Sequence, residues 1–356
     1  MVLTHLKLRR FRNYDSLDID FDPKLNLILG KNGTGKSNLA EAIFYLSLAR
    51  SWRTSEDRLL VKEGEEVATI EAAIQEGPLN RSVSIELSKS HKRIAVNGKN
   101  VRRLSELSAL TNVICFSPGD VPLFMGNPGV RRNFLDVSLA KSSLDYFTLI
   151  ARYDRLLRER NAALKEASPN LKLLDVLTEQ MIEVSLPLIR LRALYVNEIN
   201  RVLPGILNAL KGPRSSGTLV YRPFVKGDEN FTENARAAFK KALESDLKHR
   251  TTSVGPHRED LSFLLNGKDL ADYGSQGENR MAVLSLKLAP YFLIEDPEKK
   301  PILVLDDVAS ELDETHTKNL FAFIKTLGQV FVTATEIQTP DAAVIDVSEG
   351  KATRRK

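Results

Sequence analysis

The sequence is poor in cysteine and histidine and has no long apolar run, and each absence excludes a class of protein. Among its 356 residues a single cysteine, Cys115, rules out an internal disulfide, and none of the five histidines stands at zinc-ligand spacing from it. No apolar stretch reaches the roughly 18 residues of a membrane-spanning helix, and the first ten residues lack the apolar core of a secretory signal. A hydrophobic fraction of 42% with 27% charged residues is typical of soluble globular proteins. We therefore expect a cytoplasmic protein that does not bind membranes.

The length and the charge distribution suggest two domains with different partners. Single cores rarely grow beyond roughly 250–300 residues, so a chain of 356 residues allows two domains. The net charge is +5, but residues 121–250 carry 21 basic and 14 acidic side chains, whereas residues 251–356 carry 12 and 17. A basic middle third favours a polyanion-binding region, although a solvated helical face gives the same counts.

Hydrophobic periodicity separates α/β ends from a helical middle. The predicted elements are a buried strand at 25–29, a helix at 38–48, an antiparallel meander at 67–101, helices over 131–210, a strand near 218–221, helices at 233–249 and 278–294, a strand at 301–305, a helix at 315–326 and a strand at 330–333. Pro169, Pro187 and Pro204 are expected to break or kink the helical run. We predict an α/β head built from residues 1–120 and 251–356, with an antiparallel β subdomain and a mostly helical domain inserted at 121–250.

A phosphate-binding loop follows the first buried strand. Residues 30–37 read Gly-Lys-Asn-Gly-Thr-Gly-Lys-Ser, which fits G-x-x-x-x-G-K-[S/T] between a strand and a helix. Glycines allow consecutive backbone N–H groups to close around phosphate oxygens, and the helix N-terminus adds a partial positive charge. Lys36 would reach the β- and γ-phosphates, and Ser37 would offer its hydroxyl oxygen to Mg²⁺. The alternative is a glycine turn that matches by chance.

Two carboxylates follow the buried strand at 301–305. Asp306 and Asp307 come directly after four apolar residues, a pattern that favours a central parallel strand. Such a strand delivers its C-terminal side chains to the sheet edge where phosphates bind. We expect Asp306 to hold Mg²⁺ through water and Asp307 to orient or deprotonate the attacking water. Either aspartate alone would also suit a solvated acidic turn.

A second anion-binding helix terminus is predicted near residue 275. Ser275 followed by Glu278 is a capping-box pattern, and it stands 31 residues before Asp306. Many such caps have no function beyond ending a helix. A single phosphate-loop site offers no ligand for this second helix N-terminus. Its expected ligand is therefore the γ-phosphate that is bound by another copy of the protein.

The order of these motifs resembles the ATP-binding-cassette heads of the SMC-like group, and more narrowly the RecF family of bacterial recombination proteins. The resemblance covers essentially the whole chain. It rests on the phosphate loop, the Ser275-Gln-Gly-Glu segment, the Leu-Asp-Asp strand and the Ala309-Ser-Glu-Leu-Asp313 segment, and on Phe11-Arg-Asn-Tyr14, Asn97-Gly98, Gly129-Val-Arg-Arg-Asn-Phe-Leu-Asp136, Arg160-Asn-Ala-Ala163 and Gly255-Pro-His-Arg-Glu-Asp260.

The resemblance implies an ATP-dependent homodimer with two ATP molecules between facing heads. It further implies binding to DNA at gaps, both single-stranded and gapped duplex, and action with RecO- and RecR-like proteins to load RecA in repair and the SOS response. Asp313 would lie in the loop that crosses the dimer. A weak, DNA-stimulated ATPase would serve as a timer that opens the dimer. The implied ATP-binding residues are Gly30, Lys31, Asn32, Gly33, Thr34, Gly35, Lys36 and Ser37, with Ser275 and Gly277 supplied to the partner's site.

Two departures from the wider cassette pattern predict slow hydrolysis. Residues 116–120 read Phe-Ser-Pro-Gly-Asp, without the glutamine expected there, and the strand at 330–333 is followed by Ala-Thr-Glu instead of a switch histidine. Thr335 is a candidate γ-phosphate sensor. Asp307 stands where glutamate is usual in cassettes, which shortens the reach to water.

The remaining candidates are weaker. Arg12 and Asn13 are expected near the nucleotide, by resemblance to the Phe-Arg segment of related heads, although a solvated arginine at a strand end fits equally. Arginines clustered at helical spacing suit phosphate contacts without base readout, but they suit a solvated face as well. The candidate DNA residues are Arg131, Arg132, Arg155 and Arg158.

Two other functions compete with a DNA-repair ATPase. A transporter motor subunit usually has its signature about a hundred residues after the phosphate loop, whereas Ser275 follows Ser37 by 238 residues. A nucleotide-gated scaffold with negligible turnover uses the same loop, so the sequence leaves this alternative open.

Overall fold

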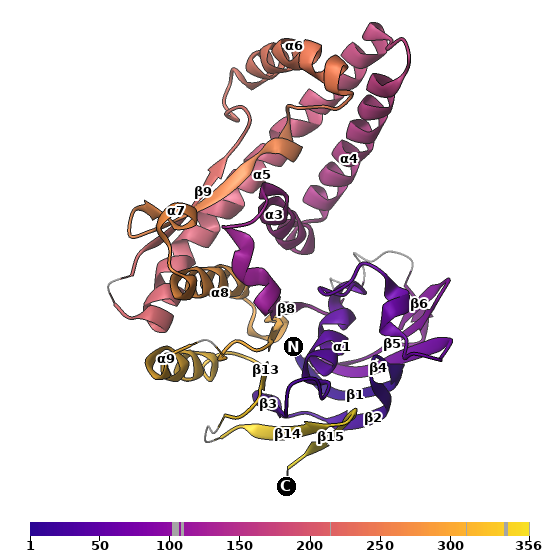
Figure 1. Ribbon diagram of the computed structural model, residues 1–356, viewed down its shortest axis with the longest axis vertical. Coiled ribbons are helices and arrows are strands. Elements are labelled where there is room, and N and C mark those ends of the chain that lie inside the picture. Colours follow the sequence, from indigo (N-terminus) through magenta and orange to yellow (C-terminus); the bar gives the residue numbers. More distant parts are fainter. Residues whose placement is uncertain (102–106, 108–109, 214, 311, 338–340, 356) are drawn as a thin grey trace. The chain divides into compact units, whose positions relative to one another are not determined.

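The computed structural model describes residues 1–101, 107, 110–213, 215–310, 312–337 and 341–355 and divides the chain into two units (Figure 1). Unit 1 comprises Met1–Val121, Gly205–Arg214 and Val283–Lys356, and unit 2 comprises Pro122–Pro204 and Ser215–Ala282. The division differs from the predicted one, which returned to the head at residue 251.

This division changes the charge argument. Unit 2 carries 22 basic and 19 acidic residues, and unit 1 carries 29 and 27, so their net charges are +3 and +2. The contrast between a basic middle third and an acidic last third therefore depended on the predicted boundary. Net charge does not single out either unit as a candidate for binding DNA.

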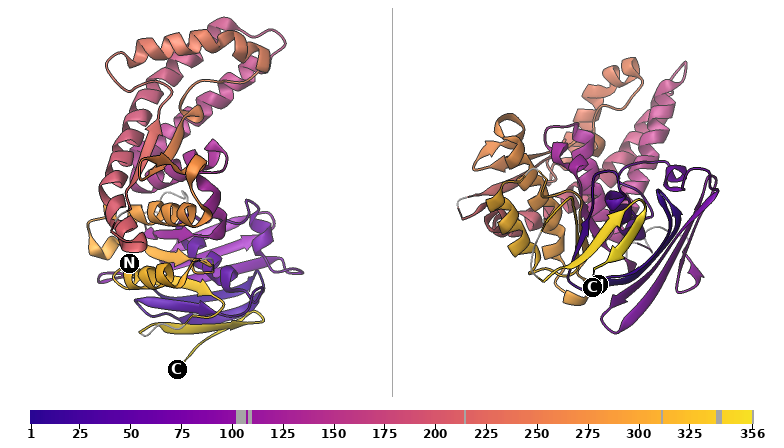
Figure 2. Two further views of the ribbon diagram at one scale, coloured as in Figure 1. Left: turned by 60° about the vertical axis from the view of Figure 1, so that its left-hand side comes forward. Right: turned by 60° about the horizontal axis from the view of Figure 1, so that its bottom comes forward.

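Unit 1 contains two six-stranded sheets (Figure 2). The antiparallel sheet has the order β2-β1-β4-β5-β6-β7, and the second sheet has the order β15-β14-β3-β13-β12-β8. In the second sheet all neighbouring strands are parallel except β14 and β15. The strands are β1 (Val2–Phe11), β2 (Tyr14–Asp20), β3 (Leu25–Leu29), β4 (Val67–Glu76), β5 (Leu79–Ser88), β6 (Lys92–Val96), β7 (Lys99–Asn100), β8 (Val113–Phe116), β12 (Ile302–Leu305), β13 (Val330–Ala334), β14 (Ala343–Ser348) and β15 (Lys351–Arg354).

Three helices cover the second sheet of unit 1. Helix α1 (Lys36–Leu48) packs between the two sheets, and its buried residues join both of them in one apolar core. Helix α9 (Glu314–Ile324) and the C-terminal part of α8 (Gln276–Leu293) contact each other through Phe323 and Phe292, whose rings stack at 5.9 Å. The strands and helices predicted from periodicity in this unit are confirmed within a few residues.

Unit 2 is helical with one small sheet. Helices α4 (Leu144–Lys165) and α5 (Leu171–Lys211) lie side by side, and Figure 1 shows α6 (Phe231–His249) beside their far ends. The end of α5, from Gly205 onward, belongs to unit 1. Ion pairs join these helices, from Arg152 to Glu183 and from Arg236 to Glu179. The remaining elements are α3 (Pro128–Ser142), α7 (Leu270–Tyr273) and the antiparallel sheet β11-β10-β9, with β9 at Gly217–Arg222, β10 at Asp260–Leu265 and β11 at Lys268–Asp269.

Helix α5 runs for 41 residues through two prolines. Sequence analysis expected a break or kink at Pro187 and at Pro204, but neither proline ends the helix. Each proline removes a backbone hydrogen bond, at a cost of about 3 kcal/mol. The neighbours Leu188 and Leu203 are fully buried, so packing of the apolar face outweighs this local cost. Within the described residues, no helix is apolar over a length sufficient to cross a membrane.

Candidate phosphate-binding site

Parallel strands of unit 1 bring the separate motifs to one edge of the sheet. Strand β13 lies between β3 and β12, with Leu27 opposite Val332 and Leu305 also opposite Val332. The carboxyl ends of these strands therefore carry the phosphate loop, the aspartate pair and the Ala-Thr-Glu segment together. This is the edge at which parallel sheets bind ligands.

The glycines of the loop serve different purposes. A Cβ atom on Gly30 would lie 2.2 Å from the carbonyl oxygen of Val347 in β14, and one on Gly35 would lie 2.6 Å from the side-chain amide nitrogen of Asn13. Gly33 has a φ of +82° and open space around it. Gly30 and Gly35 thus allow the loop to pack against its supports, and Gly33 allows the left-handed turn.

The loop presents hydrogen-bond donors to an anion. Among the described residues, the backbone N–H groups of Gly35, Lys36 and Ser37 have no intramolecular acceptor, as expected at a helix N-terminus. The Lys36 ammonium donates to the carbonyl oxygens of Gly30 at 2.7 Å and Lys31 at 2.9 Å. Burial lowers the pKa of Lys36, while the negative charges of Asp307 and Asp306 act in the opposite direction. These donors form a cradle of the right chemistry for phosphate oxygens.

Ser37 and Asp306 lie together, as sequence analysis predicted for two groups that share a metal ion. The Ser37 hydroxyl donates to Asp306 Oδ1 at 2.8 Å, across 269 residues of chain. Asp306 is only 5% exposed, and burial raises the pKa of its carboxyl, although hydrogen bonds from Thr333 and Ser37 oppose that rise. A hydroxyl and a carboxylate oxygen are hard ligands suited to Mg²⁺, so these residues fit that ion.

Asp307 has an unusual backbone conformation. Its φ of +51° lies in the left-handed region, which asparagine and aspartate tolerate better than most residues. Its backbone N–H donates to the hydroxyl of Thr333 at 2.9 Å. The turn therefore separates two consecutive carboxylates immediately after β12.

Arg12 and Asn13 support the loop from outside. The Arg12 guanidinium makes a bidentate pair with the buried Glu41 carboxylate, with N–O distances of 2.8 and 2.7 Å. Asn13 donates to the carbonyl of Thr34 at 2.9 Å and accepts from the side chain of Asn38 at 2.8 Å. In this structure the side chain of Arg12 is therefore engaged by α1, and Asn13 fixes the loop.

The signature segment has the predicted capping geometry. The backbone N–H of Glu278 donates to the Ser275 hydroxyl at 3.2 Å, and the Glu278 carboxylate accepts from the Ser275 backbone N–H at 3.1 Å. Ser275 and Gly277 are exposed. Asp313 is also exposed and caps α9 by accepting from the backbone N–H of His316 at 2.8 Å. These groups are accessible to a second molecule.

The segment without the expected glutamine is held by Asp120. One oxygen of this carboxylate accepts from the backbone N–H and the hydroxyl of Ser117, and the other pairs with the Lys287 ammonium of α8 at 2.7 Å. Thr335, the candidate sensor, is exposed just beyond the end of β13. Thr335 therefore lies at the same sheet edge as Asp306.

The four candidate DNA arginines fall into two groups. Arg131 is 8% exposed and makes a bidentate pair with Asp260, at 2.7 and 2.9 Å, and Arg132 donates to the carbonyl oxygen of Glu259 at 2.7 Å. Arg155 and Arg158 are exposed on α4. The guanidinium of Arg131 is enclosed within unit 2 and paired with Asp260, so it is not available to contact DNA phosphates.

The motifs of unit 2 meet in a buried polar network. Arg192 is 1% exposed and donates to Glu259 at 2.6 Å, to Asp136 at 2.7 Å and to the hydroxyl of Tyr146 at 2.9 Å. The ring of His257 contacts the Tyr153 hydroxyl at 2.7 Å, and burial lowers the pKa of His257 to about 4. Sequence analysis did not single out Arg192. The Gly-Val-Arg-Arg and Gly-Pro-His-Arg segments therefore hold unit 2 together.

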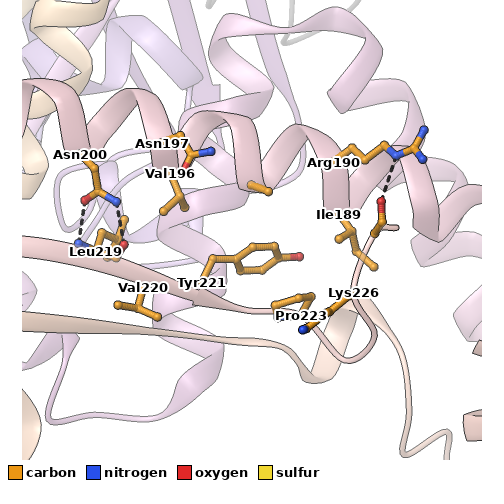
Figure 3. Close-up of a pocket in the computed structure, with 12 residues that line it drawn as sticks. Ile189, Arg190, Val196, Asn197, Asn200, Leu219, Val220, Tyr221, Pro223 and Lys226 are labelled. Atoms are coloured by element: carbon orange, nitrogen blue, oxygen red, sulfur yellow. Dashed lines mark hydrogen bonds between the residues drawn. The ribbon is translucent and has the colours of Figure 1, made fainter. Parts of the chain in front are cut away.

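Unit 2 also contains a cavity of about 420 Å³ between α5 and β9 (Figure 3). Its walls are mostly apolar, with Ile189, Val196 and Leu219 among the lining residues. The Asn200 side chain hydrogen-bonds both the N–H and the carbonyl group of Leu219, at 2.8 and 2.9 Å. Asn200 thus occupies the outer edge of β9 as a neighbouring strand would.

Sequence analysis missed three residues that shape the phosphate site. Thr333 bonds to the aspartate pair, Glu41 holds Arg12, and Gly350 donates its N–H to the Thr34 carbonyl at 3.3 Å. The only local signal is that Thr333 interrupts the continuous apolar run of β13. The positions of Glu41 and Gly350 follow from tertiary packing.

Comparison with known proteins identifies the family and the fold. Residues 2–349 match the RecF/RecN/SMC N-terminal domain family. The DNA replication and repair protein RecF of Halalkalibacterium halodurans is 37% identical over 372 residues, covering 100% of both chains. A solved structure of the recombination mediator protein RecF with ATP, from the RecFOR pathway, is 30% identical with a TM-score of 0.89, covering 100% of this chain and 98% of that one. An SMC head bound to the C-terminal winged-helix domain of ScpA, 14% identical with a TM-score of 0.59 over 100% of this chain and 97% of its own, shares the fold. The fold is therefore an ATP-binding-cassette type of head with an inserted helical domain.

Proposed function

Because this chain belongs to the RecF family, we propose that it is an ATP-dependent DNA-binding protein of recombinational repair and replication-fork maintenance. The observation that carries the proposal is the contact between Ser37 and Asp306 at 2.8 Å, which joins the phosphate loop to the aspartate strand. A relative of this family has been solved with ATP, and the structural match to it covers 100% of this chain.

In the proposed site the loop binds the ATP phosphates. Backbone N–H groups of residues 35–37 and the Lys36 ammonium would receive the β- and γ-phosphates. Ser37 and Asp306 would hold Mg²⁺, which would neutralise negative charge on the phosphates. Asp307 would orient or deprotonate the attacking water. Its short side chain and the missing switch histidine support slow turnover.

The proposed active form is a head-to-head homodimer with two ATP molecules at the interface. Ser275 and Gly277 of one copy would contact the γ-phosphate held by the other copy, and Asp313 would lie close to the same interface. The exposure of all three residues supports this arrangement. ATP binding would close the dimer and hydrolysis would open it, so a slow ATPase acts as a timer.

The proposed nucleic-acid partner is DNA at gaps, single-stranded and gapped duplex. Arg155 and Arg158 are exposed on α4 and suit phosphate contacts without base readout. RecO- and RecR-like proteins are the proposed protein partners, with RecA loading and the SOS response as the outcome. The relative solved in the RecFOR pathway supports this assignment by family membership.

A second candidate is a nucleotide-gated scaffold with negligible turnover. It is favoured by Asp307 at the usual position of a glutamate and by the exposed Thr335 in place of a histidine. Both candidates predict ATP-dependent dimerisation. Only the ATPase predicts that hydrolysis limits the lifetime of the dimer.

Light scattering coupled to size exclusion tests the proposal. We expect the wild type to dimerise with ATP and Mg²⁺, and Lys36→Ala to stay monomeric because the ammonium group that binds the phosphates is lost. Asp307→Asn should form a longer-lived dimer, since asparagine keeps the left-handed φ but does not activate water.

Lys99→Ala is the matched control, because Lys99 is an exposed lysine of β7 in the same unit. It should dimerise like the wild type. A wild-type chain that remains monomeric with ATP at micromolar concentration would refute the clamp. A dimer whose lifetime is the same in the wild type and in Asp307→Asn would favour the scaffold.

A further inference from the structure

Thr333 is a buried hydroxyl group at the centre of the phosphate-binding edge. It is 1% exposed and stands near the end of β13, the strand between β3 and β12. Its hydroxyl donates to Asp306 Oδ1 at 2.7 Å and accepts from the backbone N–H of Asp307 at 2.9 Å. One side chain therefore contacts both residues of the aspartate pair.

The two hydrogen bonds constrain different parts of the pair. Asp306 Oδ1 is shared by the hydroxyls of Thr333 and Ser37, which fixes the direction of the carboxylate toward the phosphate loop. The bond to the Asp307 N–H holds the peptide that precedes a left-handed residue, with a φ of +51°. An unpaired N–H at this partly buried position would be costly, so the hydroxyl also stabilises the turn.

We propose that Thr333 is a positioning residue for ATP hydrolysis, which orients Asp306 toward Ser37 and fixes the backbone that carries Asp307. This inference rests on the proposed ATPase function. Thr333 acts through the two aspartates and does not contact the nucleotide in this role. Its loss should therefore lower kcat more than it weakens ATP binding, because small displacements of catalytic groups reduce rates steeply.

The test compares variants that differ in the hydroxyl group. Thr333→Val keeps the branched shape and removes the hydroxyl, whereas Thr333→Ser keeps the hydroxyl. We expect kcat to fall about 10- to 100-fold in Thr333→Val and to stay within about threefold of wild type in Thr333→Ser. The dissociation constant of a non-hydrolysable ATP analogue should change by less than about threefold in both variants.

Thr111→Val provides a matched control for the loss of a buried threonine hydroxyl. Thr111 lies in the same unit, is fully buried, and donates to the carbonyl oxygens of Leu46 at 2.5 Å and Leu107 at 3.1 Å. Thr111→Val should lower the thermal midpoint as Thr333→Val does, while its kcat stays at the wild-type value. If Thr333→Val does not fold, Thr333→Ala against Thr333→Ser makes the same comparison.

The outcomes separate the two hypotheses. If turnover of the wild type depends on Lys36 and Thr333→Val has the wild-type kcat, the proposed role of Thr333 is overturned. The proposed ATPase function would not be affected by that result. Failure of Thr333→Ser to restore turnover, or a loss of affinity as large as the loss of kcat, would overturn it as well. A wild type without Lys36-dependent turnover would instead overturn the ATPase on which the inference rests.

Discussion

Replacing Arg192 by methionine should destabilise unit 2 more than any surface substitution. Arg192 is 1% exposed, and its partner Glu259 is equally buried at 2.6 Å. Breaking a buried ion pair by removing one partner costs about 3–5 kcal/mol. Glu259 keeps hydrogen bonds from the Tyr221 hydroxyl and the Phe224 N–H, and Asp136 is partly exposed, so the lower end of this range, about 3 kcal/mol, applies.

Urea unfolding measured with two signals checks this value. Far-UV circular dichroism reports mainly the helices of unit 2, whereas the single tryptophan, Trp52, lies in unit 1 and packs against Phe44. With an m-value of about 2 kcal/mol/M, a loss of 3 kcal/mol moves the midpoint by about 1.5 M urea. We expect this shift in the circular dichroism signal of Arg192→Met.

The dependence on pH and a double variant identify the cause. Burial raises the pKa of Glu259 in the folded state, against the opposing charge of Arg192. Removing Arg192 raises the pKa of Glu259 in the folded state further, so the folded variant takes up a proton more readily than the unfolded chain. The variant therefore loses stability as the pH rises through the pKa that Glu259 has in the folded state. The defect of Arg192→Met should thus shrink toward pH 5, and Arg192→Met/Glu259→Gln should recover most of it at pH 7. A shift below about 0.5 M urea, or no recovery in the double variant, would refute the reasoning.

Two further predictions concern the nucleotide site and the DNA surface. A Cβ atom on Gly350 would lie 2.4 Å from the Asn13 carbonyl oxygen, so Gly350→Ala should weaken binding of a fluorescent ATP analogue about tenfold. Gly64 has a similar φ and open space around it, so Gly64→Ala should not weaken that binding. Charge reversal at Arg155 and Arg158 should reduce the slope of log affinity for duplex DNA against log salt by about 1.8, since each phosphate contact contributes about 0.9.

The controls of these two experiments are matched in charge and backbone. Arg58→Glu with Arg354→Glu reverses two exposed arginines of unit 1 and makes the same change in net charge. It should leave the salt dependence unchanged. If the slope of log affinity for DNA against log salt is equal in all variants, the DNA surface lies away from α4. If Gly350→Ala and Gly64→Ala bind the ATP analogue with equal affinity, Asn13 does not couple β14 to the loop.

Local patterns identified the elements of the candidate phosphate-binding site. A run of apolar residues before Gly30, the glycine spacing up to Ser37 and the apolar run before Asp306 each lie within a dozen residues. Backbone conformation and strand burial over such distances depend on neighbouring side chains. The same holds for the capping box at Ser275, whose two hydrogen bonds involve residues three positions apart.

Arginines show what local patterns do not determine. Three arginines on helices have different surroundings. Arg131 pairs with Asp260, Arg155 is exposed, and Arg192 is enclosed by Glu259 and its neighbours. Helical spacing alone gave the first two the same prediction. The difference arises from carboxylates more than 60 residues away in the chain, which only folding brings into contact.

The sequence by itself determined the chemistry of the phosphate loop, the aspartate pair and the family resemblance, because these depend on residue types at short spacing. Only the tertiary structure decided where the units divide, that α5 continues through Pro187 and Pro204, and that Thr333 contacts both aspartates. Those outcomes depend on packing and on hydrogen bonds between strands that are adjacent in the sheet but distant in the chain. A buried polar group must find its partner wherever the fold places one.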